Sequence, residues 1–174
     1  MESVHQVRPA DDLDVPSLAL ALASMRGEDL GDIAIDLPVD GVSDQHAKML
    51  LGAVRSIGGE VLVAVSSGAV SGFVVLTPEA ETGNARMGFG VAVTREWRRQ
   101  GVGLALVSSA QRWSSSAGFE YMDLWVRVEN TAARALYSKL GFRPSGESGG
   151  RTTQGKVLMS CALASVASRP VPRN

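Results

Sequence analysis

A turn rich in arginine and glycine, residues 94–103, separates a short apolar run from a stretch with helical spacing. Arg98 and Arg99 supply positive charge there, and Gly101 and Gly103 lack the β-carbon that would keep a ligand away from the backbone. A helix that begins at this point leaves its first backbone N–H groups unpaired, and its dipole adds partial positive charge. The residue types and their spacing therefore predict a site for a phosphate or diphosphate group, with a solvated arginine turn as the alternative.

The order of these residues resembles a known cofactor loop. Arg98-x-x-Gly101-x-Gly103 after an apolar strand is similar to the acyl-CoA diphosphate loop of the GNAT superfamily of N-acetyltransferases. About thirty residues further on, Asn130-x-x-Ala133-x-x-x-Tyr137 is similar to a second motif of that superfamily. Each motif alone is moderately specific, but the two occur in the family order with a strand-like stretch between them, which makes a chance match a weak explanation.

The resemblance implies a role for individual residues. It implies that acetyl-CoA is bound as the co-substrate and that Tyr137 is the general acid that protonates the departing thiolate. Because Tyr137 also falls on the apolar face of its expected helix, packing in the core is the alternative. The residues that the resemblance places against the cofactor are Val91, Ala92, Val93, Arg98, Arg99, Gln100, Gly101, Val102, Gly103, Leu104, Asn130, Ala133 and Tyr137.

The sequence leaves more than one source for the general base. Many relatives in the superfamily carry a glutamate on the strand that corresponds to residues 86–93, and this chain has none there. A water relay from backbone carbonyls is one alternative. The carboxylate candidates are Glu28, Asp29, Asp32, Asp36 and Glu129. In the superfamily the segment equivalent to residues 26–42 lies over the acceptor side, so Glu28, Asp29 and Asp32 are predicted to bind a cationic amine, against the alternative of a solvated loop.

Composition excludes several classes of protein. The chain has 174 residues with 17 basic and 18 acidic side chains, so its charge gives no sign of a nucleic-acid-binding surface. We find no apolar run long enough for a membrane span and no secretory signal, and we expect a cytoplasmic protein. Cys161 is the single cysteine, and His5 and His46 stand apart from other metal-binding residues, so neither an intramolecular disulfide nor a metal site is expected. The oligomeric state is left open, with a homodimer as one alternative.

Hydrophobic periodicity outlines the elements that position these residues. The predicted order is strand, two helices, three strands, helix, strand, helix and strand. Strands are predicted at residues 4–8, 61–65, 69–76, 86–93, 121–128 and 156–163. Gly88 and Gly90 suggest a bulge or a close backbone approach in the fourth strand. This order is similar to the α/β fold of the GNAT superfamily, in which a mixed, mostly antiparallel central sheet is flanked by about four helices. We expect one such domain over residues 1–164, followed by a flexible tail at 165–174.

Two functions of different classes follow from the resemblance. The first is an enzyme that transfers an acetyl group from acetyl-CoA directly to a primary amine of a small molecule or peptide. The second is a non-catalytic module of the same fold that binds acyl-CoA as a sensor or binds a partner. The complete glycine loop, Asn130 and Tyr137 favour the enzyme, and the missing strand glutamate is what favours the second function.

Overall fold

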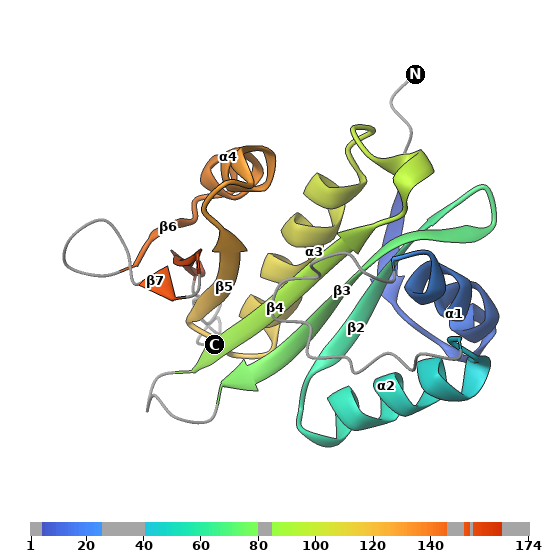
Figure 1. Cartoon of the computed structure of the whole chain (residues 1–174). Helices are drawn as coiled ribbons and strands as arrows, with labels where there is room; N and C mark the ends of the chain where they lie inside the picture. Colours follow the sequence, from blue (N-terminus) through green and yellow to red (C-terminus); the bar gives the residue numbers. More distant parts are fainter. Residues whose placement is uncertain (1–4, 26–40, 80–84, 146–151, 154, 165–174) are drawn as a thin grey trace, which may run out of the picture.

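A computed structural model describes residues 5–25, 41–79, 85–145, 152–153 and 155–164 (Figure 1). These residues form strands, α-helices and two short 3₁₀ turns. The strands are β1 (Gln6–Pro9), β2 (Glu60–Ser66), β3 (Ala69–Glu79), β4 (Arg86–Val93), β5 (Tyr121–Arg127), β6 (Arg143–Pro144), β7 (Thr152–Thr153) and β8 (Lys156–Ala162). The helices are α1 (Val15–Ser24), α2 (Asp44–Ser56), α3 (Val102–Ser116) and α4 (Thr131–Lys139), and the 3₁₀ turns are η1 (Asp12–Asp14) and η2 (Arg95–Trp97).

The strands form one sheet, in the order β1-β2-β3-β4-β5-β8-β6, and β7 pairs with β8 beside this path. β4 and β5 pair in parallel, whereas the other neighbours among the described strands are antiparallel. β3 and β4 keep an unbroken register from Gly72 opposite Val93 to Glu79 opposite Arg86. A mixed, mostly antiparallel sheet with four flanking helices is the fold class that the sequence predicts.

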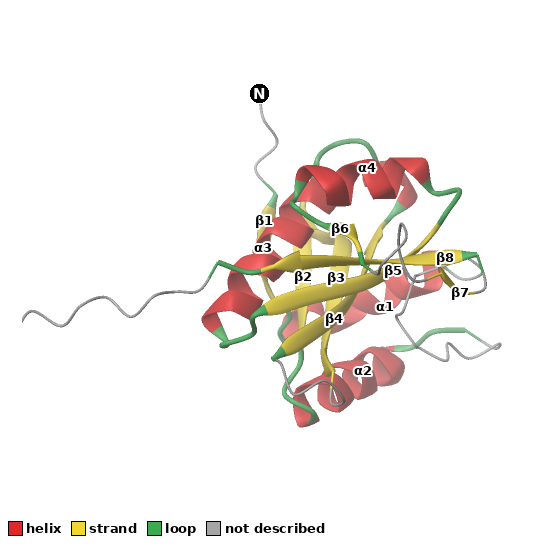
Figure 2. Ribbon diagram, turned by 90° about the vertical axis from the view of Figure 1, so that its left-hand side faces the viewer, coloured by secondary structure: helices red, strands yellow, loops and turns green. Residues whose placement is uncertain are grey.

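Helices cover both faces of the sheet (Figures 1 and 2). Successive residues of a strand point to opposite faces, and β3 shows this plainly. Phe73 and Val75 lie in a core with α1 and α2, whereas Val74 and Leu76 lie in a second core with α3 and the end of α4. The central strands are therefore apolar on both faces, which explains why β2 and β3 read as nearly continuous valine-rich runs.

Gly72 fixes how closely α3 approaches the sheet. A β-carbon on Gly72 would lie 2.7 Å from the carbonyl oxygen of Ala92, 3.0 Å from Leu106 Cδ1 and 3.2 Å from Val102 Cγ1. Any side chain there would push the first turns of α3 away from β3, since contacts under 3.0 Å with backbone atoms are not tolerated. Glycine at this position therefore places the N-terminus of α3 directly beside the end of β4.

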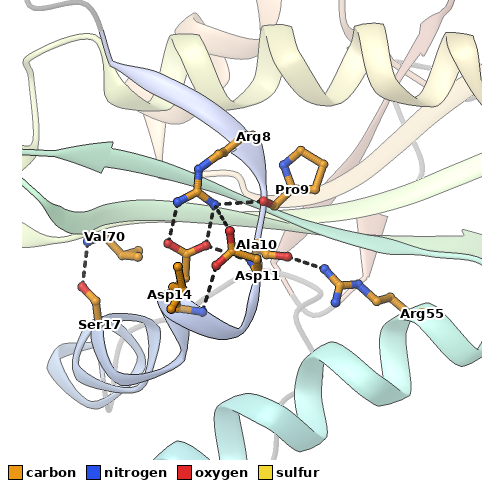
Figure 3. A network of polar contacts seen from close by, with 9 residues as sticks. Arg8, Pro9, Ala10, Asp11, Asp14, Ser17, Arg55 and Val70 are labelled. Carbon is orange, nitrogen blue, oxygen red and sulfur yellow. Dashed lines mark hydrogen bonds and ion pairs between the residues drawn. The ribbon is translucent and has the colours of Figure 1, made fainter.

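An ion pair joins β1 to the start of α1 (Figure 3). The guanidinium of Arg8 donates to both carboxylate oxygens of Asp14, at 2.6 and 2.9 Å. Asp14 also accepts from the backbone N–H of Asp11 at 2.9 Å, while the Asp11 side chain accepts from the N–H of Leu13 at 2.8 Å, so the two aspartates form a capping box. Because Asp14 is buried, its charge depends on these partners.

Replacing Asp14 by asparagine should destabilise the fold at neutral pH and much less in acid. Burial tends to raise the pKa of the Asp14 carboxyl, but the hydrogen bonds from Arg8 and from the backbone of Asp11 outweigh it and hold that pKa below its ordinary value. The carboxylate therefore contributes stability above the unfolded pKa of about 3.9, and the contribution is lost as pH falls through the lowered folded pKa. Urea unfolding should place Asp14→Asn about 1–2 kcal/mol below the parent at pH 7, with the gap closing as the pH falls below the unfolded pKa and through the lowered folded pKa.

Asp12→Asn is the matched control for this prediction, because Asp12 is exposed in the same turn. A loss of stability in Asp14→Asn that is equally large at pH 7 and in acid would contradict the role given to the ionised carboxylate.

The structure differs from the sequence-based expectation in two details. β4 has no bulge against β3, and the irregular register falls instead between Ala64 and Val65 of β2. Gly88 allows a close approach, since a β-carbon there would lie 3.2 Å from Glu79 Oε1. β6 and β7 were not predicted, because strands of two residues are too short to give a periodic signal. The expected tail at 165–174 lies outside the described residues.

None of the helices that the structure describes has the length and apolar character needed to cross a bilayer.

Candidate active site

β4 and β5 run parallel but pair along only part of their length. Pairing joins Arg86–Gly88 to Tyr121–Asp123, although β4 continues to Val93 and β5 to Arg127. Beyond Gly88 the strands separate, so the backbone N–H and C=O groups of β4 that point toward β5 have no partner on a described strand. The fork between these strands therefore offers free backbone hydrogen-bonding groups to a ligand.

Two adjoining cavities run from this fork to the turn before α3. The first, of about 200 Å³, is lined by Phe89, Gly90, Val91, Val93, Gly103, Leu124, Trp125, Val126, Arg127, Asn130, Ala133, Leu136 and Tyr137. The second, of about 530 Å³, is lined by Val93, Trp97, Arg98, Arg99, Gly101, Gly103, Leu104, Ala132, Ala133, Ala135, Leu136 and Lys139. They share Val93, Gly103, Ala133 and Leu136, so they form one continuous depression, here called the groove.

The turn before α3 presents backbone N–H groups at one end of the groove. Arg99 and Gly101 adopt left-handed backbone conformations, with φ of 63° and 86°. Among the described residues, none accepts a hydrogen bond from the backbone N–H groups of residues 99–104. These donors and the N-terminal dipole of the fifteen-residue helix α3 favour an anion here.

Side-chain charge acts in the same direction. Arg98, Arg99 and Lys139 line the second cavity, and its lining contains no carboxylate among the residues described. Arg98 is further held by a hydrogen bond from its Nε to the carbonyl of Val93, at 3.0 Å. This end of the groove is therefore suited to a phosphate or diphosphate group.

Asn130 forms the N-cap of α4 beside the other end of the groove. Its Oδ1 accepts a hydrogen bond from the backbone N–H of Ala133 at 3.1 Å. The cap uses the amide oxygen and leaves the amide NH₂ without a partner among the described residues, so this donor is available to a ligand.

Tyr137 of α4 lines the first cavity of the groove. Its ring packs against those of Phe89 and Phe142, with centroids 6.0 and 5.9 Å away, and only 8% of its surface is exposed. Burial raises the pKa of Tyr137 to about 12, so its hydroxyl keeps its proton throughout the physiological range. That hydroxyl bonds to no described residue, although Tyr137 lines the first cavity. The ring of Tyr137 therefore belongs to the core, as the packing alternative predicts, and the residue also borders the groove, while its role as general acid stays a prediction.

A buried ion pair lies at the base of the fork. The guanidinium of Arg86 on β4 donates to both oxygens of Asp123 on β5, and to Ser160 Oγ on β8 at 3.1 Å. Arg86 also lies over the ring of Tyr121, 4.7 Å from its centroid. This ion pair holds β4 and β5 together where their pairing ends, and the two strands diverge beyond it.

The structure brings most of the predicted cofactor residues to the groove. Those along it are Val91, Val93, Arg98, Arg99, Gly101, Gly103, Leu104, Asn130, Ala133 and Tyr137. Ala92, Gln100 and Val102 do not line it: Ala92 is buried in the core on the α1 and α2 side, and Val102, the first residue of α3, is buried in the core on the other side of the sheet. The backbone carbonyl of Gln100 contacts His5, and its side chain donates to the carbonyl of Glu96 at 2.7 Å.

One of the acidic candidates falls within the described residues, and the others do not. Glu28, Asp29, Asp32 and Asp36 lie outside the described residues. Glu129 is described and exposed, 3.6 Å from Arg127, and it does not line the groove. In the part of the chain that the structure describes, no three His, Cys, Asp or Glu side chains gather as a metal site would require.

Sequence reasoning missed the wall that β5 contributes. Leu124, Trp125, Val126 and Arg127 line the first cavity because β5 bends away from β4. The signal available was indirect, since β5 follows α3 and so had to return parallel to β4. Leu136 was also missed, although it lies three residues after Ala133 on the same face of α4.

Comparison with known proteins gives this geometry a family context. Residues 29–142 match the acetyltransferase (GNAT) family. The aminoglycoside N(6')-acetyltransferase type 1 of Klebsiella aerogenes is 30% identical over 151 residues, which cover 82% of this chain and 91% of that protein. An uncharacterised N-acetyltransferase of Bacillus subtilis is 39% identical over 57 residues. This match covers 33% of this chain and only 23% of the length of the Bacillus protein.

A solved structure shares the fold at lower identity. The GNAT superfamily phosphinothricin acetyltransferase of Sinorhizobium meliloti, crystallised in complex with acetyl-CoA, superposes with a TM-score of 0.71. The superposition covers 99% of this chain and 95% of that one at 19% identity, which shows a common fold.

Proposed function

The chain belongs to the GNAT family of acetyltransferases, and we propose that it transfers an acetyl group from acetyl-CoA to the primary amine of a small molecule. One observation carries this proposal: a single groove joins free backbone donors at the start of α3 to a neutral, buried tyrosine in the fork of β4 and β5. Such a groove suits a ligand with an anionic end and a reactive apolar end.

The residues present fit acetyl-CoA in sections. The diphosphate would lie against the N–H groups of residues 99–104 and the cations Arg98, Arg99 and Lys139. The pantetheine arm would follow the free edge of β4, with the amide of Asn130 as a further donor. The acetyl thioester would then reach the first cavity, near Tyr137.

The chemistry requires an amine to attack the thioester carbonyl, and the tetrahedral intermediate then expels the thiolate of CoA. Unpaired N–H groups of β4 beyond Gly88 can stabilise the oxyanion. Tyr137 can donate its proton to the sulfur as the C–S bond breaks, because burial keeps its hydroxyl protonated until that moment, and the tyrosine then regains a proton from solvent. The acetyl group thus moves from sulfur to nitrogen, and the amine proton leaves through solvent or a base.

The acceptor is proposed to be a small molecule that carries a primary amine. The similarity to an aminoglycoside acetyltransferase over most of both chains supports a small amine-bearing acceptor rather than a protein surface. The acids Glu28, Asp29 and Asp32 are proposed to attract such a cation, in a single catalytic domain that spans residues 1–164.

Release of free CoA thiol tests the proposal. The chain should release thiol from acetyl-CoA with at least one amine in a panel of aminoglycosides, polyamines, amino acids and short peptides. Mass spectrometry should find that amine about 42 Da heavier, which is the mass that one acetyl group adds. Binding of acetyl-CoA without turnover of any amine would favour the sensor module instead. Absence of binding would overturn both functions.

A further inference from the structure

His5 connects the segment before β1 to the turn before α3, ninety-five residues away in the sequence. Its Nε2 lies 2.8 Å from the backbone carbonyl oxygen of Gln100, and its ring meets that of Trp97 edge-on, with centroids 6.1 Å apart. Both partners belong to the turn that supplies backbone donors to the groove. His5 itself does not line the groove, so any influence on a ligand must pass through this turn.

The other ring nitrogen of His5 is held by the end of the β2–β3 hairpin. Nδ1 lies 3.0 Å from Ser66 Oγ, which is 3.0 Å from Ser71 Oγ, and Ser71 Oγ donates to the carbonyl of Ala64 at 3.1 Å. Ser66 and Ser71 are buried. The imidazole is therefore fixed from behind by groups that belong to the rigid centre of the sheet.

The same hairpin also holds the beginning of the turn. The carbonyl oxygen of Ser71 accepts hydrogen bonds from the backbone N–H and the hydroxyl of Thr94, at 3.0 and 3.1 Å. Thr94 begins the turn and Gln100 lies near its end. The turn is thus attached to β2 and β3 at both ends, directly through Ser71 at the first and through His5 at the second.

The proton inventory makes His5 a donor to Gln100. A carbonyl oxygen can only accept, so Nε2 must carry hydrogen to bond it at 2.8 Å. The opposite nitrogen faces a hydroxyl, which can donate to a neutral ring or accept from a charged one. The bond from Nε2 to Gln100 therefore exists in either protonation state of the ring.

Peptide geometry then connects His5 to the groove. The Gln100 carbonyl and the Gly101 N–H belong to one planar trans peptide and point in opposite directions. With the carbonyl held toward His5, the N–H is held away from it. Gly101 lines the second cavity, and this N–H has no acceptor among the described residues. Left-handed Gly101 could otherwise rotate this peptide freely, because a glycine is conformationally permissive.

We propose that His5 is a positioning residue that orients the Gly101 N–H toward the diphosphate of acetyl-CoA. The inference rests on the proposed function, since it concerns the same cofactor. It predicts that losing the Nε2 donor weakens only ligands that carry the diphosphate and leaves the chemistry at the thioester unchanged.

His5→Ala tests this role against a general loss of structure. The KM for acetyl-CoA and the Kd for CoA should rise about three- to tenfold, with kcat at saturating acetyl-CoA unchanged. Binding of pantetheine, which lacks the diphosphate, should be unaffected. His5→Gln, whose Nε2 can donate at a similar reach, should recover most of the affinity for CoA.

His46→Ala is the matched control, because His46 is the second of the two histidines and caps α2 far from the groove. Calorimetry should show no change in its affinity for CoA. If the unchanged chain binds CoA and His5→Ala binds it equally well, the positioning role is overturned alone. The role is also overturned if pantetheine and CoA weaken together. If the unchanged chain binds no CoA, the proposed function and this inference are overturned together.

Discussion

Gly103→Glu is expected to abolish acetyl-CoA binding while the fold is retained. Gly103 lines both cavities of the groove at the start of α3. A β-carbon there would lie 3.4 Å from Leu136 Cδ2 and 3.7 Å from Val93 Cγ2, which is ordinary contact, so the backbone has no need to move. The rest of a glutamate side chain would have to occupy the groove and would bring a carboxylate to a site suited to an anion. We expect the Kd for acetyl-CoA to rise by at least about a hundredfold in calorimetry.

Two variants control for this result. Gly103→Ala adds only the β-carbon and should lower affinity slightly or not at all. Gly52→Glu makes the same change on the exposed face of α2, where a β-carbon meets nothing within 4 Å, and should leave binding intact. Unchanged affinity in Gly103→Glu, with cooperative unfolding like that of the parent, would remove the diphosphate from this end of the groove.

Features that depend on neighbouring residues could be read from the sequence. The start of α3 at Val102 follows from an apolar strand, a polar turn and glycine at the N-cap. The end of α4 follows from Gly141, whose φ of 91° is left-handed, and from Phe142, which folds back into the core and is fully buried. Asn130 directly precedes α4, and its side chain forms the N-cap, a role that its residue type favours.

Features that depend on pairing between residues far apart in the chain could not be predicted from the sequence. Asp123 is only 3% exposed although it carries a carboxylate, because Arg86 of another strand neutralises it. Gly88 and Gly90 mark β4 as an irregular strand, but the sequence does not say from which neighbour β4 separates. His5 gave no signal because its partners lie sixty-one and ninety-five residues away.

This difference also explains why β4 shows the close approach predicted for its glycines and not the bulge. Gly88 and Gly90 weaken a strand locally, and a bulge against β3 is a common consequence of such residues. The register with β3 is nevertheless continuous, because valine-rich β3 pairs along the whole of β4. The weak partner was β5, which pairs only with Arg86–Gly88, so the irregularity appears as a separation of strands.

Tyr137→Phe should lower kcat by about a hundredfold or more, with little change in affinity for acetyl-CoA. Phenylalanine keeps the ring contacts with Phe89 and Phe142, so the core is preserved. The hydroxyl bonds to no described residue, so its removal leaves no described hydrogen-bonding group without a partner. The substitution should therefore change the free energy of unfolding by less than about 0.5 kcal/mol. A fall in turnover without a fall in stability would therefore report the chemistry and not the packing.

The pH dependence and a second tyrosine complete the test. The pKa of Tyr137 is about 12, so the parent's rate should rise with pH only as the acceptor amine loses its proton, and Tyr137→Phe should keep that profile at a lower level. Tyr121→Phe removes the hydroxyl of the other tyrosine, which lies beneath Arg86 and does not line the groove, and should leave kcat unchanged. Equal turnover in Tyr137→Phe and the parent would assign Tyr137 to the core alone, and the proton for the thiolate would then have to come from water.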